Sequence, residues 1–273
     1  MGKQIKLTVS VLGCGWLGLP LAEELLQQGF AVNGSTTTSE KLEHLAKKGI
    51  DPFYVELTEE SIKGEVFSFL DGAEVLVVDI PPGLRKKPDA NFVKKIKHFI
   101  PKLKLSAVEK VILVSSTSVF EDEENFPEYT EKSTPNGKSD ASRQLQEVEK
   151  LFRENTHFTT TVIRMGGLLG KDRHPVKFLS GRKGISNPLA PVNLIQQQDA
   201  VQLIVKALQQ ENFGSIFHGV YPLHPHKEEY YTQKAKLFNL ALPEFTSDKT
   251  SEGKKISSEA TQKELQFTFQ HSI

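Results

Sequence analysis

Gly13-Cys14-Gly15-Trp16-Leu17-Gly18 is the stretch that decides the predicted fold, because it places the spacing G-x-G-x-x-G between a strand and a helix. The residues before it, 5–12, are apolar and rich in β-branched side chains, which predicts a strand. The residues after it, 19–28, are apolar at helical spacing, and Gly29 ends the predicted helix. In this context the glycines indicate a dinucleotide-binding turn.

Each glycine of the turn has a separate expected role. Gly13 permits the tight turn, Gly15 lets a pyrophosphate approach the backbone, and Gly18 lets the helix pack close to the strand. Amides at the start of the helix then face the phosphates. Pro20 falls in the first helical turn, where a missing N–H costs nothing. The residues expected to bind the cofactor here are Gly13, Cys14, Gly15, Trp16, Leu17 and Gly18.

Composition limits the class of protein and its partners. The chain has 273 residues, of which 38% are hydrophobic and 25% charged, as in ordinary globular domains. Its 34 basic residues balance 34 acidic ones, so we expect neither nucleic acid nor membrane as a partner. The single cysteine, Cys14, excludes an internal disulfide, suits a reducing compartment and is expected to pack rather than react. With no apolar run of 18 residues and a strand at the start, we expect a cytoplasmic protein.

Strand-like and helix-like segments alternate up to residue 163. We predict strands over 30–34, 53–55, 75–80, 111–114 and 159–163, and helices over 40–48, 90–104 and 138–154, with Ser39 as the N-cap of the first of these helices. Apart from Asp79, the run 75–80 is apolar, as expected of a strand covered on both faces. This alternation predicts an α/β fold with a Rossmann-type, doubly wound parallel sheet.

After Arg164 the alternation becomes irregular. Helices are predicted over 196–210 and 227–237 and a strand over 215–219, while 247–255 is polar and expected to be mobile. We therefore predict an NAD(P)-binding domain over 1–165 and a smaller C-terminal substrate lobe over 166–273 that is partly interleaved with it.

Two groups of side chains leave alternatives open. The basic residues within 85–104 suit a phosphorylated substrate, but a solvated helix face explains them better. His218, His224 and His226 offer metal ligands, yet prolines at 222 and 225 interrupt their spacing and no cysteine or carboxylate cluster joins them. We predict no metal site.

Three features together resemble the extended short-chain dehydrogenase/reductases: the glycine turn, the segment Ser115-Ser116-Thr117-Ser118-Val119-Phe120 after a strand, and the long helix that follows. Within that superfamily the chain is similar to the atypical YeeZ-like branch, which is described as epimerase/dehydratase-like. The closer likeness lies in Gly34-Ser35-Thr36-Thr37-Thr38, Arg164-Met165-Gly166-Gly167-Leu168, Arg173-His174-Pro175 and Val192-Asn193-Leu194.

The resemblance implies NAD or NADP bound beside a small, sugar-derived or anionic substrate. It implies that Ser116 holds the reacting carbonyl, with Ser115 or Thr117 as substitutes; the alternative is that these hydroxyls only cap the strand end. Further cofactor contacts are implied for Ser35, Thr36, Thr37, Ile80, Pro81 and Ser115, and substrate contacts for Thr117, Ser118, Arg173 and His174. The alternative for Arg173 is a surface ion pair, and the alternative for His174 is a packed side chain; these structural roles are as well supported as substrate binding.

The chain departs from the superfamily at its acid/base pair. Where active members carry Tyr-x-x-x-Lys on the long helix, this sequence has Ser139 and Arg143. A serine hydroxyl does not ionise near neutral pH under such neighbours, and arginine stays protonated. The spacing recurs at Tyr230 and Lys234, in the other lobe, where we interpret it as chance. An active enzyme would need another acid/base, such as Tyr129, His174 or a water.

One position in the sequence bears on the choice between NAD(H) and NADP(H), which differ by a phosphate on the ribose 2′ oxygen. An acid after the second strand favours NAD(H), but here the position falls at Ser35, and the following threonines carry no negative charge. This favours NADP(H) over NAD(H). The sequence thus predicts an NAD(P)-dependent oxidoreductase or nucleotide-sugar epimerase-like enzyme acting on a small molecule, with an oligomer possible. The alternative is a non-catalytic dinucleotide-binding sensor.

Overall fold

The computed structural model describes residues 7–84, 87–210, 213–247 and 250–273. The predicted strand residues Ile5 and Lys6, Arg85 and Lys86 of the basic stretch, and residues 248–249 of the tail lie outside these ranges. The chain forms two compact units. Unit 1 comprises Met1–Ser115, Ser139–Ile163 and Val201–Ile216, and unit 2 comprises Ser116–Lys138, Arg164–Ala200 and Phe217–Ile273. Residues 116–138 belong to unit 2, and residues 201–216 belong to unit 1.

The central sheet has eight strands. They are β1 (Thr8–Leu12), β2 (Ala31–Thr36), β3 (Asp51–Leu57), β4 (Ile62–Gly64), β5 (Val75–Val78), β6 (Lys110–Ser116), β8 (Thr159–Met165) and β11 (Ile216–Gly219). Their order is β11-β8-β6-β5-β1-β2-β3-β4. The pairs β1–β2, β1–β5, β2–β3 and β5–β6 are parallel, and the short β4 pairs antiparallel with β3. The strand order reverses between β1 and β5, which confirms the predicted doubly wound, Rossmann-like α/β fold.

The strands at this reversal are buried on both faces. Every residue of β5 is buried, as are Val9 to Leu12 of β1. Since successive side chains of a strand point to opposite faces, this burial means that both faces of the sheet are covered. The one polar residue among them, Ser10, donates its hydroxyl to the Phe69 carbonyl at 2.7 Å.

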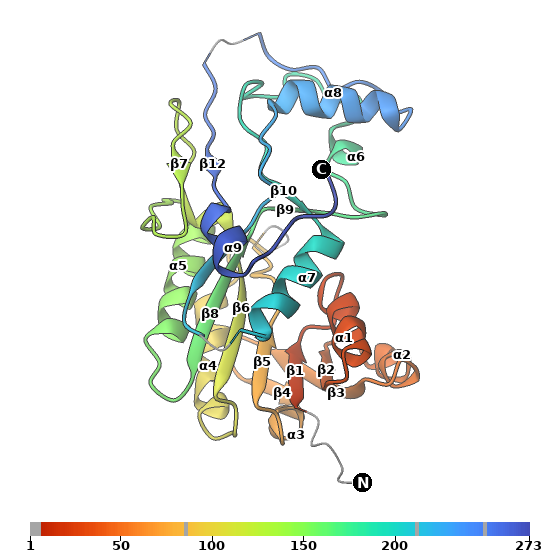
Figure 1. The fold of residues 1–273 in the computed structure, drawn as a ribbon, viewed down its shortest axis with the longest axis vertical. Helices are drawn as coiled ribbons and strands as arrows, with labels where there is room; N and C mark the ends of the chain where they lie inside the picture. The colour runs from red at the N-terminus through yellow and green to blue at the C-terminus, as the bar shows by residue number, and fades with distance from the viewer. Residues whose placement is uncertain (1–6, 85–86, 211–212, 248–249) are drawn as a thin grey trace. The chain divides into compact units, whose positions relative to one another are not determined.

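Helices flank the sheet strands. They are α1 (Gly18–Gln27), α2 (Leu42–Lys47), α3 (Val66–Leu70), α4 (Phe92–Leu103), α5 (Asp140–Arg153) and α7 (Gln197–Leu208), with a 3₁₀ turn η1 (Ser39–Lys41). Helix α7 begins in unit 2 and continues in unit 1 from Val201, and the others lie in unit 1. Helix α1 packs against β2, α2 against β3, and α4 against α5 (Figure 1). The predicted N-cap role of Ser39 is wrong, because Ser39 opens the 3₁₀ turn and α2 begins only at Leu42.

Unit 2 contains shorter elements. They are η2 (Thr117–Val119), β7 (Glu128–Tyr129), β9 (Gly167–Leu169), α6 (Val176–Leu179), β10 (Leu194–Gln196), α8 (Lys227–Leu237), β12 (Lys255–Ile256) and α9 (Glu259–Glu264). Strand β9 pairs with β10, β7 pairs with β12, and α6 packs beside α8 (Figure 1). A core of Leu169, Val176, Val192, Leu194, Tyr230, Tyr231 and Ala235 lies between them. Within the described ranges of the whole chain, no helix combines the length and apolarity needed to cross a bilayer.

The polar tail does not behave as a mobile segment in its described part. Gly253 and Glu123 exchange main-chain hydrogen bonds of 2.9 and 3.0 Å, and β12 follows directly. The expectation of mobility over 247–255 is therefore wrong for residues 251–255. A polar composition does not exclude pairing with a distant strand, which no local pattern shows.

Candidate functional site

The glycine turn joins β1 to α1 and is anchored to β2. Gly13 has φ of +104°, in the left-handed region, and a Cβ there would lie 2.5 Å from the Asp79 carbonyl oxygen. The Gly13 N–H donates to Ser35 Oγ at 2.9 Å, and the Cys14 N–H donates to the Ser35 carbonyl at 2.8 Å. Both backbone strain and close approach therefore require glycine at position 13.

Packing within the protein requires glycine at position 18 but not at position 15. A Cβ on Gly18 would lie 2.2 Å from the Gly13 carbonyl oxygen, so the protein's own packing excludes any side chain. At Gly15, which is exposed and not in the left-handed region, the nearest heavy atom would be 3.9 Å away. The fold itself therefore permits a side chain at Gly15. The open space at Gly15 lies beside the start of α1, where the N-cap residue Leu17 makes no side-chain capping hydrogen bond, and it fits the pyrophosphate of a dinucleotide.

The end of β5 completes this edge of the sheet. Leu12 of β1 pairs with Val78 of β5, so the residues after both strands emerge side by side. The Ile80 methyl would be 3.0 Å from a Cβ on Gly13, which puts Ile80 against the turn; Pro81 is exposed next to it. The carboxylate of Asp79 also reaches the turn, 3.0 Å from the Cβ position of Gly18. Sequence analysis assigned Asp79 no role, although it is the one charged residue within the run 75–80.

Within the glycine turn, Cys14 and Leu17 bury their side chains. Burial, followed by the Asp79 carboxylate, raises the pKa of the Cys14 thiol to about 12. The thiol therefore stays protonated and packs, as the sequence predicts. Leu17 is buried as well, whereas Trp16 is half-exposed. Cys14 and Leu17 can meet a ligand only through their backbone.

The side chain of Ser35 was expected to contact the cofactor, but it lies against the glycine turn. Its side chain is buried, and its hydroxyl accepts the Gly13 N–H, so it supports the turn rather than pointing to solvent. Thr36 is buried too, and its Oγ1 accepts the Thr38 N–H at 3.2 Å. Thr37, by contrast, is exposed. The accessible hydroxyls after β2 therefore begin at Thr37.

A buried hydroxyl–carboxylate pair lies at the end of β6. Ser115 Oγ donates to Glu149 Oε1 at 2.6 Å, and both residues are buried in unit 1. Glu149 projects from α5 at a position in register with the apolar residues Leu145 and Phe152. Glu149 is a charged residue within an apolar helical stripe, a pattern visible in the sequence, but sequence analysis assigned it no role.

Ser139 and Arg143 lie at the start of α5. Ser139 is the N-cap, and its Oγ accepts the Ser142 N–H at 3.2 Å. Arg143 is exposed and lies 3.9 Å from the carboxylate of Asp140. The two residues are four positions apart at the start of α5, where the family resemblance placed the Tyr–Lys pair.

In unit 2, the predicted substrate hydroxyls begin a 3₁₀ turn. Ser116 Oγ accepts from the Ser118 N–H at 3.2 Å and from Ser118 Oγ at 3.0 Å. Thr117 is buried, and Ser118 is exposed. Ser116 therefore caps η2, but a hydroxyl that accepts two hydrogen bonds still has its own proton to donate.

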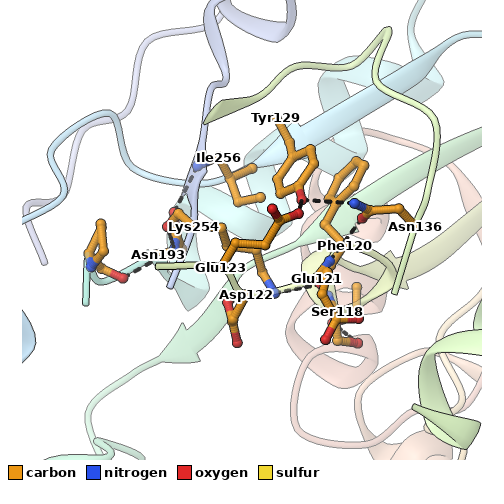
Figure 2. Close-up of polar contacts among 12 residues, drawn as sticks. Ser118, Phe120, Glu121, Asp122, Glu123, Tyr129, Asn136, Asn193, Lys254 and Ile256 are labelled. Atoms are coloured by element: carbon orange, nitrogen blue, oxygen red, sulfur yellow. Dashed lines mark hydrogen bonds and ion pairs between the residues drawn. The ribbon is translucent and has the colours of Figure 1, made fainter. Parts of the chain in front are cut away.

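Tyr129, the alternative acid/base, is held in a network (Figure 2). Its ring stacks on Phe120 at 4.4 Å, its hydroxyl donates to Glu123 Oε1 at 3.3 Å, and Asn136 Nδ2 donates to it at 3.0 Å. Burial, opposed by the Asn136 bond and reinforced by Glu123, raises the pKa of Tyr129. These contacts favour a structural role over proton transfer.

The same network includes the C-terminal segment. Lys254 Nζ donates to the Phe120 carbonyl at 2.7 Å and pairs with Asp122 at 3.0 Å (Figure 2). The Asn193 amide bonds the Lys254 carbonyl and the Ile256 N–H at 2.8 and 2.9 Å. Asn193, which carries part of the family resemblance, therefore holds β12 in place.

His174 is a packed histidine. The Val176 N–H donates to Nδ1 at 3.1 Å, so Nε2 carries the proton and faces the Tyr230 hydroxyl at 3.2 Å. Burial, followed by Lys234 and Lys177, lowers the pKa of His174 to about 4. The ring is therefore neutral at physiological pH and cannot neutralise an anion. Neighbouring Arg173 is exposed.

Two of the three histidines weighed as metal ligands face main-chain oxygens. His218 Nδ1 lies 2.8 Å from the Ser257 carbonyl, and His224 Nδ1 lies 3.1 Å from the Val192 carbonyl. In the part of the chain that the structure describes, no three His, Cys, Asp or Glu side chains gather into a metal-binding group.

Comparison with known proteins bears on the site. A family model described as NAD(P)H-binding matches residues 13–211, more than half of the chain. The protein YeeZ of Escherichia coli K12 is 29% identical over 265 residues, which cover 96% of both chains.

Solved structures share the fold. UDP-N-acetylglucosamine 4-epimerase from Bacillus cereus superposes with a TM-score of 0.78 at 15% identity, covering 98% of this chain and 92% of that one. UDP-glucose 4-epimerase from Thermotoga maritima, solved with UDP-glucose, gives 0.77 at 15% identity over 97% and 94% of the two chains. A protein of unknown function from Silicibacter pomeroyi gives 0.74 at 19% identity over 97% and 94%.

Proposed function

The chain belongs to the NAD(P)H-binding family, and from this premise we propose that it is an NAD(P)-dependent oxidoreductase or epimerase-like enzyme acting on a small, anionic or sugar-derived substrate. The observation that carries the proposal is Gly15, whose missing side chain serves no internal packing and leaves room for a pyrophosphate. The shared fold with two UDP-sugar 4-epimerases supports the substrate class.

The chain's residues have distinct proposed roles. The glycine turn and the start of α1 bind the dinucleotide, whose nicotinamide ring, when bound, supplies or accepts a hydride. Ser115, fixed by Glu149, and Ile80 border the cofactor. Ser116 uses its remaining proton to hold the substrate oxygen. Ser139 and Arg143 occupy the places of the usual Tyr–Lys pair without supplying a group that ionises near neutral pH.

We expect NADPH to bind about two- to tenfold more tightly than NADH, a difference of roughly 1 kcal/mol, because no carboxylate follows Ser35 to repel a 2′-phosphate. Ser35→Asp should move the preference toward NADH, since its carboxylate can accept the Gly13 N–H and repel the phosphate. Ser35→Ala is the control that loses the same hydrogen bond without adding charge. Titration of protein fluorescence with each cofactor measures this, and NADH binding as tight as NADPH in the wild type would refute the preference.

A second candidate function is a non-catalytic dinucleotide sensor, favoured by the replacement of the Tyr–Lys pair. We expect weak wild-type oxidation of NAD(P)H with UDP-sugars and small carbonyl compounds. Ser139→Tyr with Arg143→Lys should raise the rate by about 10²–10⁴, the usual contribution of general acid–base catalysis. The matched control, Ser139→Ala with Arg143→Lys, loses the same N-cap, worth about 1 kcal/mol, but gains no phenol.

The outcomes separate the two functions. Robust wild-type turnover that survives Ser139→Ala would mean that another residue transfers the proton. Absence of turnover in the wild type and in the Tyr–Lys variant, with the cofactor still bound, would favour the sensor.

A further inference from the structure

Unit 2 contains a shallow pocket of about 440 Å³ that the proposed function does not use. It lies between the loop after β9, α6 and the C-terminal end of α8, and α6 and α8 pack together (Figure 1). Its described lining includes Lys171, Lys177 and Lys234 but no aspartate or glutamate. The pocket therefore concentrates positive charge in a chain that has no net charge overall.

Lys234 is held at the wall of this pocket. Its ammonium lies 5.3 Å from the centre of the Tyr230 ring and donates to the main-chain oxygen of Ile273 at 2.9 Å. These contacts restrict the side chain before any ligand arrives, which lowers the entropy lost on binding. An ammonium has three donors, so the bond to Ile273 leaves capacity for an anion. The Tyr-x-x-x-Lys spacing at 230–234 thus positions a cation over a ring.

The apolar side of the pocket is formed by Leu237 and Phe238, which are 69% and 42% exposed. Large apolar side chains left this open beside a pocket are typical of ligand contacts. The Phe238 ring meets His174 edge-on, with centroids 5.2 Å apart, which fixes its orientation. Because His174 is neutral, the lysines alone supply the charge.

We propose that this pocket binds a small organic anion, whose phosphate or carboxylate group is held by Lys171, Lys177 and Lys234 and whose apolar portion lies on Leu237 and Phe238. The volume falls within the range of small-molecule sites. Lysine ammonium groups bind phosphate as compact point charges, which suits a site without the planar fork of arginine. His174 lines the same pocket without a positive charge, and the role predicted for Arg173 stays a prediction.

The test uses phenyl phosphate as the probe, with inorganic phosphate and benzyl alcohol for comparison, by isothermal titration calorimetry on the full chain. We expect phenyl phosphate to bind more tightly than inorganic phosphate, and benzyl alcohol to bind weakest. Lys171→Gln with Lys177→Gln should weaken phenyl phosphate about tenfold, as expected for loss of two charge-assisted contacts. Phe238→Ala should weaken phenyl phosphate and leave inorganic phosphate unchanged.

The matched control is Lys183→Gln with Lys236→Gln, which removes two lysines outside the pocket lining. Equal losses in the control and the pocket variant, or no loss in the pocket variant, would overturn the proposal. All titrations are repeated in Gly15→Val, where a phosphate cannot bind at the glycine turn. Retained binding there assigns the anion to unit 2, whereas binding abolished by Gly15→Val would place the probe at the turn and also overturn the proposal. The assignment of the dinucleotide to the glycine turn is tested separately, by NADPH binding, and neither outcome of the phenyl phosphate titrations decides it.

Discussion

Gly15→Val is expected to abolish NADPH and NADH binding, with the dissociation constant raised at least about a hundredfold, while the protein stays folded. The valine side chain fills the space that a pyrophosphate needs, and a Cβ at this position meets no protein atom closer than 3.9 Å. Trp16, the one tryptophan of the chain, adjoins the position, so intrinsic fluorescence reports binding at the turn.

Gly15→Ala completes a graded series, because its single methyl group should weaken binding less than valine does. Circular dichroism and urea unfolding check that both variants keep the wild-type fold. A folded Gly15→Val protein that binds either cofactor within threefold of the wild type would show that the dinucleotide site lies elsewhere.

Gly18→Ala is expected to reduce the free energy of unfolding by about 3 kcal/mol or more, at the upper end of overpacking effects. A Cβ at Gly18 would lie 2.2 Å from the Gly13 carbonyl oxygen and 3.0 Å from an Asp79 carboxylate oxygen. The first contact is with backbone, so no side-chain rotation relieves it, and either the strand β1 or the helix α1 must move. Urea unfolding monitored by circular dichroism measures the loss.

The control for Gly18→Ala is Gly15→Ala, which adds the same methyl group three residues earlier. There the backbone conformation and the surrounding space accept alanine, so we expect stability unchanged or raised by up to about 1 kcal/mol. Equal stability of Gly18→Ala and Gly15→Ala would mean that the close approach of α1 to the turn is not what requires glycine.

Elements with a clear local pattern could be predicted from the sequence, and short elements without such a pattern could not. The predicted helix over 227–237 coincides with α8, and the strand over 75–80 contains β5. The elements β4 and α3, of three and five residues, are too short to show a period and went unpredicted. The pairing of residues 251–256 with Glu123 and β7 depends on a partner more than 120 positions away.

The sequence by itself determined the glycine turn and the doubly wound fold, because both follow from local signals: glycine spacing, apolar runs and their alternation. Only the tertiary structure decided that Ser35 supports the turn, that Glu149 binds Ser115, and that His174 is packed and neutral. It also brought Lys171 and Lys177 to Lys234 across a long stretch of chain. The physical reason is that burial, hydrogen-bond partners and pKa shifts depend on which distant segments pack together. The residues next to a position in the sequence do not show which distant segment packs against it.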